Sequence, residues 1–115
     1  MPISNQNRLD KVVQTTTITA STSETTILTA NATNLQDIYG LIISNTSATA
    51  TSVTIKDATA GTTRMNISVP AGETRGFMLA VSDAVPQQSA VNNNWTATSS
   101  VSVSSLVITV LAIKA

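Results

Sequence analysis

Six carboxylates are the main groups in this 115-residue chain that could carry out chemistry. A pair of carboxylates on facing loops could hydrolyse a glycosidic bond, and several within a dozen residues could hold calcium. No two of the six lie within three residues of each other, and most fall at predicted turns. We therefore interpret them as solvated turn residues and expect no catalytic residue and no metal site. The six are Asp10, Glu24, Asp37, Asp57, Glu73 and Asp83.

Other reactive side chains are scarce. The sequence has no histidine, the commonest general base and metal ligand, and no cysteine that could act as a thiol nucleophile or form a disulfide. A hydroxyl nucleophile would need a base beside it, and no G-x-S-x-G, P-loop or G-x-G-x-x-G motif occurs. These absences predict a protein that is not an enzyme and that binds no cofactor.

The charge pattern limits the class of partner. The formal net charge is zero, 10% of residues are charged, and there is no basic cluster, so we expect no direct contact with nucleic acid. The longest apolar run, at 106–113, is shorter than a membrane span, and the first residues lack the pattern of a secretory signal. We expect a protein with no membrane partner that is made in a cytoplasm.

The composition favours β-structure. The chain contains 20 threonines and 14 serines, and threonine, valine and isoleucine are β-branched residues that pack well on a pleated sheet. Hydrophobic residues make up 42% of the chain and occur in runs, which argues against disorder. Short apolar or alternating segments recur between turn residues, a pattern typical of a sandwich or barrel.

We predict a single antiparallel β-sandwich of the jelly-roll or Greek-key kind, preceded by an N-terminal arm. The arm is residues 1–10, which carry no strand pattern, and the sandwich domain is residues 11–115. The long segment 82–94 suits a crossover between two sheets and could hold one helical turn. About eight strands are expected, at 11–20, 24–30, 37–45, 49–57, 62–69, 75–79, 95–99 and 105–113.

Alternation and turn chemistry give three more detailed predictions. Met65, Ile67 and Val69 should point inward from their strand, with the residues between them pointing outward. Gly61 should take the positive φ that closes a hairpin, and Pro70–Glu73 should form a second tight turn, with Pro70 fixing φ early and Gly72 later. The last strand, at 105–113, is almost wholly apolar and should be buried on both faces or lie in the middle of its sheet.

The three aromatic residues bear on carbohydrate binding. Trp95, Tyr39 and Phe77 are the only members of their types, and we interpret them as core or subunit-contact residues. A sugar-binding module would need Trp95 or Tyr39 exposed in a groove with convergent polar groups, as a stacking platform. The row Thr15, Thr17 and Thr19 is a single row, so exposed strand packing explains it better than ice binding.

The sandwich must have edge strands, and few lysines guard them. Closed assemblies are a common way to use such edges and apolar faces, so we expect a symmetric homo-oligomer.

Three segments resemble small β-sandwich structural proteins of tailed bacteriophages, a group that includes capsid decoration, or cement, proteins. The segments are Ile38–Asp57 (IYGLIISNTSATATSVTIKD), Val69–Glu73 (VPAGE) and Asn94–Thr98 (NWTAT) with the Ser/Val-rich strand that follows. The resemblance spans roughly 36–113. It implies a jelly-roll-like trimer that binds the major capsid protein on the outer surface of the virion, at local three-fold positions, and it carries over no ligand or catalytic residue.

The function expected from this resemblance is head decoration, in which the protein stabilises the shell by burying area on several capsid subunits. Two alternatives stay open: a head–tail connector, tail or fibre component, and a carbohydrate- or surface-binding module from another class. Partner contacts are expected from the arm and from the long loop, at Ile3, Asn5, Leu9, Pro86, Gln87 and Gln88.

Overall fold

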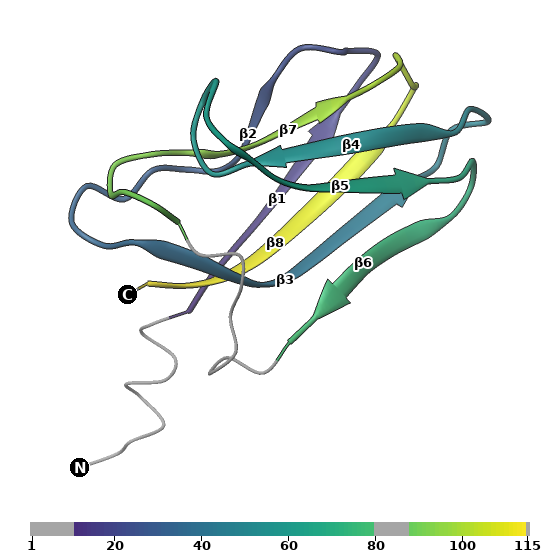
Figure 1. The fold of residues 1–115 in the computed structure, drawn as a ribbon. Helices are drawn as coiled ribbons and strands as arrows, with labels where there is room; N and C mark the ends of the chain where they lie inside the picture. Colours follow the sequence, from purple (N-terminus) through teal and green to yellow (C-terminus); the bar gives the residue numbers. More distant parts are fainter. Residues whose placement is uncertain (1–10, 80–87, 115) are drawn as a thin grey trace.

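The computed structural model describes residues 11–79 and 88–114, which form eight strands and no helix (Figure 1). The predicted N-terminal arm lies outside this part, as do residues 82–87 of the long loop before β7. The strands are β1 (Lys11–Ile18), β2 (Thr25–Leu28), β3 (Gln36–Asn45), β4 (Thr51–Lys56), β5 (Thr63–Val69), β6 (Thr74–Met78), β7 (Trp95–Ser99) and β8 (Leu106–Lys114).

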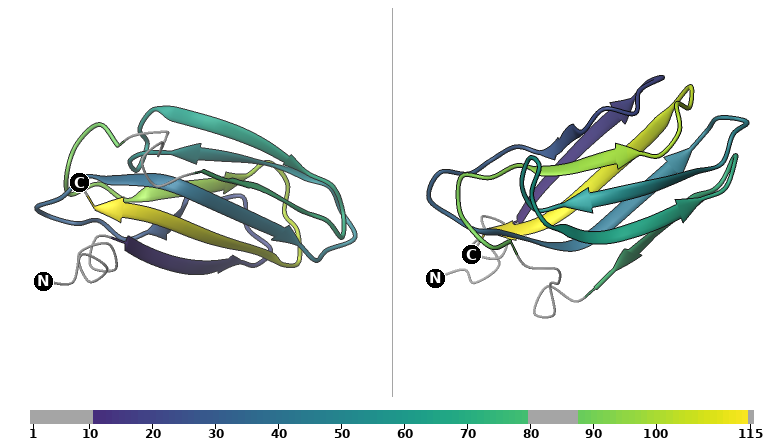
Figure 2. Two further views of the ribbon diagram at one scale, coloured as in Figure 1. Left: turned by 90° about the horizontal axis from the view of Figure 1, so that it is seen from below. Right: turned by 45° about the horizontal axis from the view of Figure 1, so that its top comes forward.

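The strands form two antiparallel sheets of four that pack face to face. The first sheet has the order β1-β8-β3-β6 and the second has the order β2-β7-β4-β5, and Figure 2 shows the two layers from two further directions. Every connection crosses from one sheet to the other except that between β4 and β5, which pair as a hairpin in the second sheet. This is the jelly-roll arrangement of eight strands and confirms the predicted β-sandwich. β8 lies between β1 and β3, as expected for the most apolar strand.

Period-two alternation explains which residues fill the core. In β8 every second side chain, from Leu106 to Ala112, is fully buried, and in β4 Val53 and Ile55 are buried between half-exposed neighbours. Met65 and Ile67 are half-buried against this core, as their alternation predicted. The space between the sheets is therefore filled mainly by aliphatic side chains.

One predicted turn is right and the other is wrong in detail. The tight turn at Pro70–Glu73 forms as predicted: the Glu73 N–H donates to the Pro70 carbonyl at 3.2 Å, and Gly72 has a φ of 70°. Between β4 and β5 the left-handed residue is Ala60, with a φ of 55°, and Gly61 is not left-handed. Glu24 gives the physical reason, because both of its carboxylate oxygens accept a hydrogen bond from the Ala60 N–H at 3.0 Å and fix this conformation.

Residues 88–94 are the described part of the long connection, and they contain no helical turn. Here Asn92 is left-handed, with a φ of 63°, and its N–H donates to the carbonyl of Asn31 at 2.7 Å. In the described ranges, no helix has the length and apolarity needed to cross a membrane.

Candidate interaction surface

The outward side of the first sheet carries most of the exposed apolar side chains of the described chain. We call it the apolar face. Side chains at this face come from all four strands, and the register places them in three rows across the sheet. The rows are Val13–Leu111–Gly40–Met78, Thr15–Thr109–Ile42–Gly76 and Thr17–Val107–Ser44–Thr74.

The first row is a continuous apolar band from one edge of the sheet to the other. Val13 is 63% exposed and Met78 is 57% exposed, although both are large hydrophobic residues. A Cβ atom at Gly40 would lie 2.8 Å from the Met78 sulfur and 3.1 Å from the Leu111 Cδ1. The missing side chain at Gly40 therefore lets Met78 and Leu111 lie over the backbone of β3. In the next row Ile42, which is 38% exposed, widens the band.

Several polar groups of the apolar face are already paired with each other. The Thr15 and Thr109 hydroxyls lie 3.2 Å apart across β1 and β8, and the Thr74 hydroxyl donates to Ser44 at 3.2 Å across β6 and β3. Burying a polar group is costly mainly when the group loses its hydrogen bonds. A protein that covered this face could therefore remove these hydroxyls from water at low cost.

The outward side of the second sheet has the opposite character. Its cross-strand neighbours are polar, as in the pairs Ser52–Ser68 and Thr54–Thr98. The Ser52 hydroxyl donates to Asn66 at 2.7 Å, and this side also carries the charged side chain of Lys56. Such a surface is well solvated. The two outer faces share one backbone architecture but differ in side chains, so the apolar face is the candidate interaction surface.

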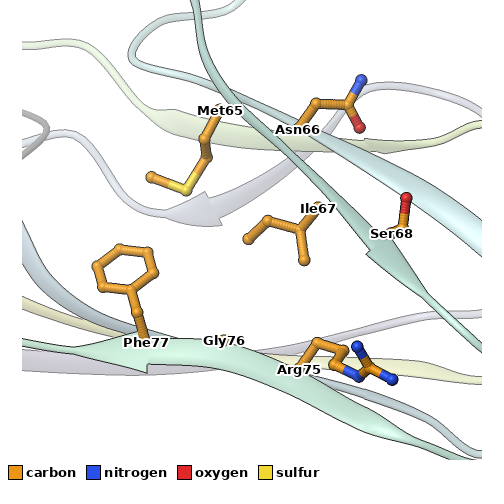
Figure 3. A pocket seen from close by; sticks show the side chains of 7 residues that line it. All are labelled: Met65, Asn66, Ile67, Ser68, Arg75, Gly76 and Phe77. Atoms are coloured by element: carbon orange, nitrogen blue, oxygen red, sulfur yellow. The ribbon is translucent and has the colours of Figure 1, made fainter.

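An open groove of about 480 Å³ lies between the edge strands β5 and β6. Figure 3 shows Met65, Ile67 and Phe77 pointing into the space between the strands, whereas Asn66 points away. Arg75 lines one end of the groove. The groove is where the two sheets separate at one side of the sandwich. It adds half-buried apolar area next to the apolar face.

Of the six residues predicted to contact a partner, only Gln88 lies in the described part of the chain. It is 4% exposed. Its Oε1 accepts the Gln36 N–H at 3.0 Å, and its Nε2 donates to the Asn93 and Asp57 carbonyls at 2.7 and 3.3 Å. The Gln88 N–H donates to Asp37 Oδ1 at 3.0 Å. Gln88 thus holds the loop to β3 and to the turn that follows β4, from inside the fold, which its position in the sequence could not show.

The remaining five predicted contacts, Ile3, Asn5, Leu9, Pro86 and Gln87, lie outside the described residues and stay predictions.

Asp57 forms the second anchor of the same loop. It is 1% exposed, and its Oδ2 accepts hydrogen bonds from Arg64 Nη2 at 2.8 Å and from the Ser89 hydroxyl at 2.9 Å. Burial alone would raise the pKa of Asp57, but the hydrogen bonds from Arg64 and Ser89 outweigh it and hold the pKa below its ordinary value. The carboxylate is therefore ionised and structural.

This pKa predicts loss of stability in acid. A carboxyl group with a lowered pKa in the folded state stabilises the fold above its unfolded pKa, near 3.8, and loses that contribution as the pH falls through the folded value. We expect the urea midpoint to fall between about pH 4 and pH 2. The Asp57→Asn variant, which cannot titrate there, should start lower and fall less. A wild-type midpoint that rose in this range would contradict the assignment.

The other candidate chemistries find no support in the described residues. Within 11–79 and 88–114, no three acidic side chains come together in a way that could hold a metal ion. Trp95 is fully buried, and its Nε1 donates to the Gln36 carbonyl at 2.7 Å. Tyr39 is 9% exposed. Neither ring offers the exposed stacking platform that the carbohydrate-binding alternative requires.

Sequence reasoning predicted exposed apolar surface in general terms but missed the apolar face itself. The outward residues of β1 and β8 alternate with inward ones of similar type, so the sequence does not show which set meets solvent. The available signal was the odd-numbered set Val107, Leu111 and Ile113 on a strand whose even-numbered residues already fill the core.

Comparison with known proteins gives similarity of fold. No family model matches the chain, and no curated protein matches its sequence. A chain from the acidic stable capsid of Helicobacter pylori bacteriophage KHP30 has a TM-score of 0.58 at 13% identity, covering 90% of this chain and 87% of that one. A chain from Bacillus endospore appendages, described as disulfide-linked pili, has a TM-score of 0.52 at 14% identity, covering 91% and 88%.

A third similar structure is PirA, with a TM-score of 0.53 at 8% identity, covering 86% of this chain and 92% of that one. At these identities the similarity concerns the fold alone. The chain shares its β-sandwich with proteins that include a phage capsid chain and a pilus chain.

Proposed function

We propose that this chain is a non-enzymatic structural protein of a bacteriophage virion, and specifically a head decoration protein. The observation that carries the proposal is the apolar face, an uncharged band across four strands in a chain of few reactive side chains. Contiguous exposed apolar area marks a surface that other protein covers. The sequence resemblance to phage sandwich proteins and the fold shared with a phage capsid chain support a virion as the place where this happens.

In this function the protein binds the major capsid protein on the outside of the head as a homo-oligomer. A trimer would match local three-fold positions, which present three equivalent capsid surfaces at once. Affinity comes from apolar area removed from water, at about 25 cal/mol per Å², multiplied over the contacts of one oligomer. The arm (Ile3, Asn5, Leu9) and the loop (Pro86, Gln87) are the proposed contacts to the shell.

The test uses heads of the phage whose genome encodes this chain, prepared with and without the gene. We expect the chain to be present in wild-type heads and absent from tails, and heads without it to lose DNA at a lower temperature. Adding the purified chain to deficient heads should give saturable co-sedimentation and restore thermal resistance. Its presence in tails alone would favour the connector, tail or fibre alternative, and absence from the virion would overturn the proposal.

A further inference from the structure

We propose that the apolar face is covered by the same face of a second copy of this chain, so that it joins the subunits of the oligomer. The inference rests on the proposed function, since it assigns the partner of the surface that carries that proposal. It also assigns the two kinds of contact to different parts of the molecule. The apolar face would join the subunits, and the arm and the loop would bind the shell.

The charge distribution permits the face to oppose itself. The three rows contain no charged residue, and Lys11 lies beyond them at one end of β1. A symmetric contact brings each residue near its own copies, so any charge on such a surface would meet a like charge. On this face no such repulsion arises. The second sheet, with Lys56 and Glu24 close to its outer side, has no comparable apolar band.

The polar groups on the face also fit a self-contact. The hydroxyls lie in the second and third rows, and the pairs Thr15–Thr109 and Thr74–Ser44 are hydrogen-bonded within one copy. These hydroxyls need no partner from across the interface, so a copy of the same face can pack on them without leaving them unsatisfied. A strongly polar partner would instead lose its own hydrogen bonds against Val13, Leu111 and Met78.

The size of the face matches a modest, specific interface. Four strands about 4.8 Å apart and about seven residues long, at about 3.3 Å per residue, give roughly 450 Å² of flat area per copy. Two such faces bury roughly 900 Å² of flat area, to which protruding side chains add further surface. This is near the lower limit of about 1,000 Å² for specific interfaces. This area belongs to the size class of weak contacts, so we expect the oligomer to dissociate on dilution, at about micromolar concentrations or above.

Two or three copies can share the face. Stacked sheets lie about 10 Å apart, which suits a two-fold pair. Three sheets that each lie about 5 Å from a common axis form a triangle with sides of about 17 Å, close to the roughly 19 Å width of four strands. The face can thus close a trimer as well as a dimer.

The first test measures solution mass by sedimentation velocity from about 1 to about 300 µM, a range that brackets the dissociation expected from the buried area. We expect the wild type to reach two or three copies at high concentration. Val13→Glu with Met78→Glu places two charges on the face and should weaken association about 100-fold or more. The control, Ser68→Glu with Thr98→Glu, adds the same charge to the outer side of the second sheet and should associate like the wild type. Fluorescence of Trp95 verifies that each variant is folded.

The second test does not depend on charged variants. Because the chain has no cysteine, Thr109→Cys introduces one thiol at the centre of the face, and Thr54→Cys introduces one on the other sheet as a control. A short bis-maleimide should cross-link Thr109→Cys into covalent dimers and leave Thr54→Cys largely uncross-linked. Equal cross-linking of both, or a wild type that stays monomeric at 300 µM, would overturn the inference.

The two proposals can fail separately. A monomer that still binds deficient heads would leave head decoration standing and remove the self-contact. A face-mediated oligomer that is absent from the virion would do the reverse.

Discussion

The Gly76→Ala variant should lose the pairing of β6 with β3. Gly76 lies opposite Ile42, and a Cβ atom there would come within 1.9 Å of the Leu41 carbonyl oxygen, closer than any real contact. That oxygen is backbone, so the strand itself must move. We expect a loss of about 3 kcal/mol in the free energy of unfolding, or detachment of β6 with loss of the Phe77 packing.

Hydrogen exchange distinguishes these two results. Detachment should raise exchange at β6 amides and at the β3 groups facing them while β8 and β7 stay protected. Gly72→Ala is the matched control, since no atom lies within 4 Å of the added Cβ. The φ of 70° at Gly72 should limit its cost to about 1–2 kcal/mol. A Gly76→Ala protein as stable as Gly72→Ala would show that the close approach of β3 and β6 is not as described.

The Gln88→Ala variant should be destabilised by about 3 kcal/mol, measured by urea unfolding with Trp95 fluorescence. The change removes three hydrogen bonds and leaves the Gln36 N–H and the Asn93 and Asp57 carbonyls without that partner in a buried region. Each unmade bond costs about 1–3 kcal/mol, and water entering the cavity would offset part of the sum.

The control for this prediction is Gln14→Ala. Gln14 also accepts a backbone hydrogen bond, from the Thr29 N–H at 2.9 Å, but it is half-exposed on β1 and water can replace the bond. Its truncation should cost about 1 kcal/mol or less. If the two variants lost equal stability, the internal role of Gln88 would be contradicted, and its predicted place at a partner contact would gain weight.

Most of the fold could be predicted because local patterns and tertiary packing agree. The side chains of β5 alternate between the two faces as predicted, because the side-chain period of a strand is two. The strand β7 has the predicted bounds, because turn residues separate it from its neighbours in the sequence. The jelly-roll strand order also agrees with the predicted class. The alternation depends on near neighbours in the chain, whereas the strand order, which places β1 beside β8, was predicted only as a class.

Features that depend on distant residues could not be predicted. Ala60 adopts its left-handed φ next to Glu24, which lies 36 positions away in the sequence. Gln88 was predicted to contact a partner because it lies in the long loop. Its hydrogen-bond partners Gln36, on β3, and Asp57, just after β4, become apparent only when the strands are in place.

The glycines of the first sheet show how one surface combines stability and binding. Gly40 lets Met78 and Leu111 meet over β3, and Gly76 lets β6 approach β3 closely. Both lie in the rows of the apolar face. The same small residues therefore allow the edge strand β6 to pair closely with β3 and keep the face flat. The stability of β6 and the integrity of the surface are therefore coupled.

Oxidation of Met78 tests the central claim, that other protein covers the apolar face, most directly. Met78 is 57% exposed in the isolated chain, and Met65, half-buried beside the core, serves as the internal reference. Mass spectrometry after brief peroxide treatment would compare the dilute chain with the assembled particle. We expect Met78 to oxidise rapidly in the dilute chain and to be protected at least about tenfold on assembly, as burial of an exposed thioether requires. An equal rate of Met78 oxidation in both states would contradict the account.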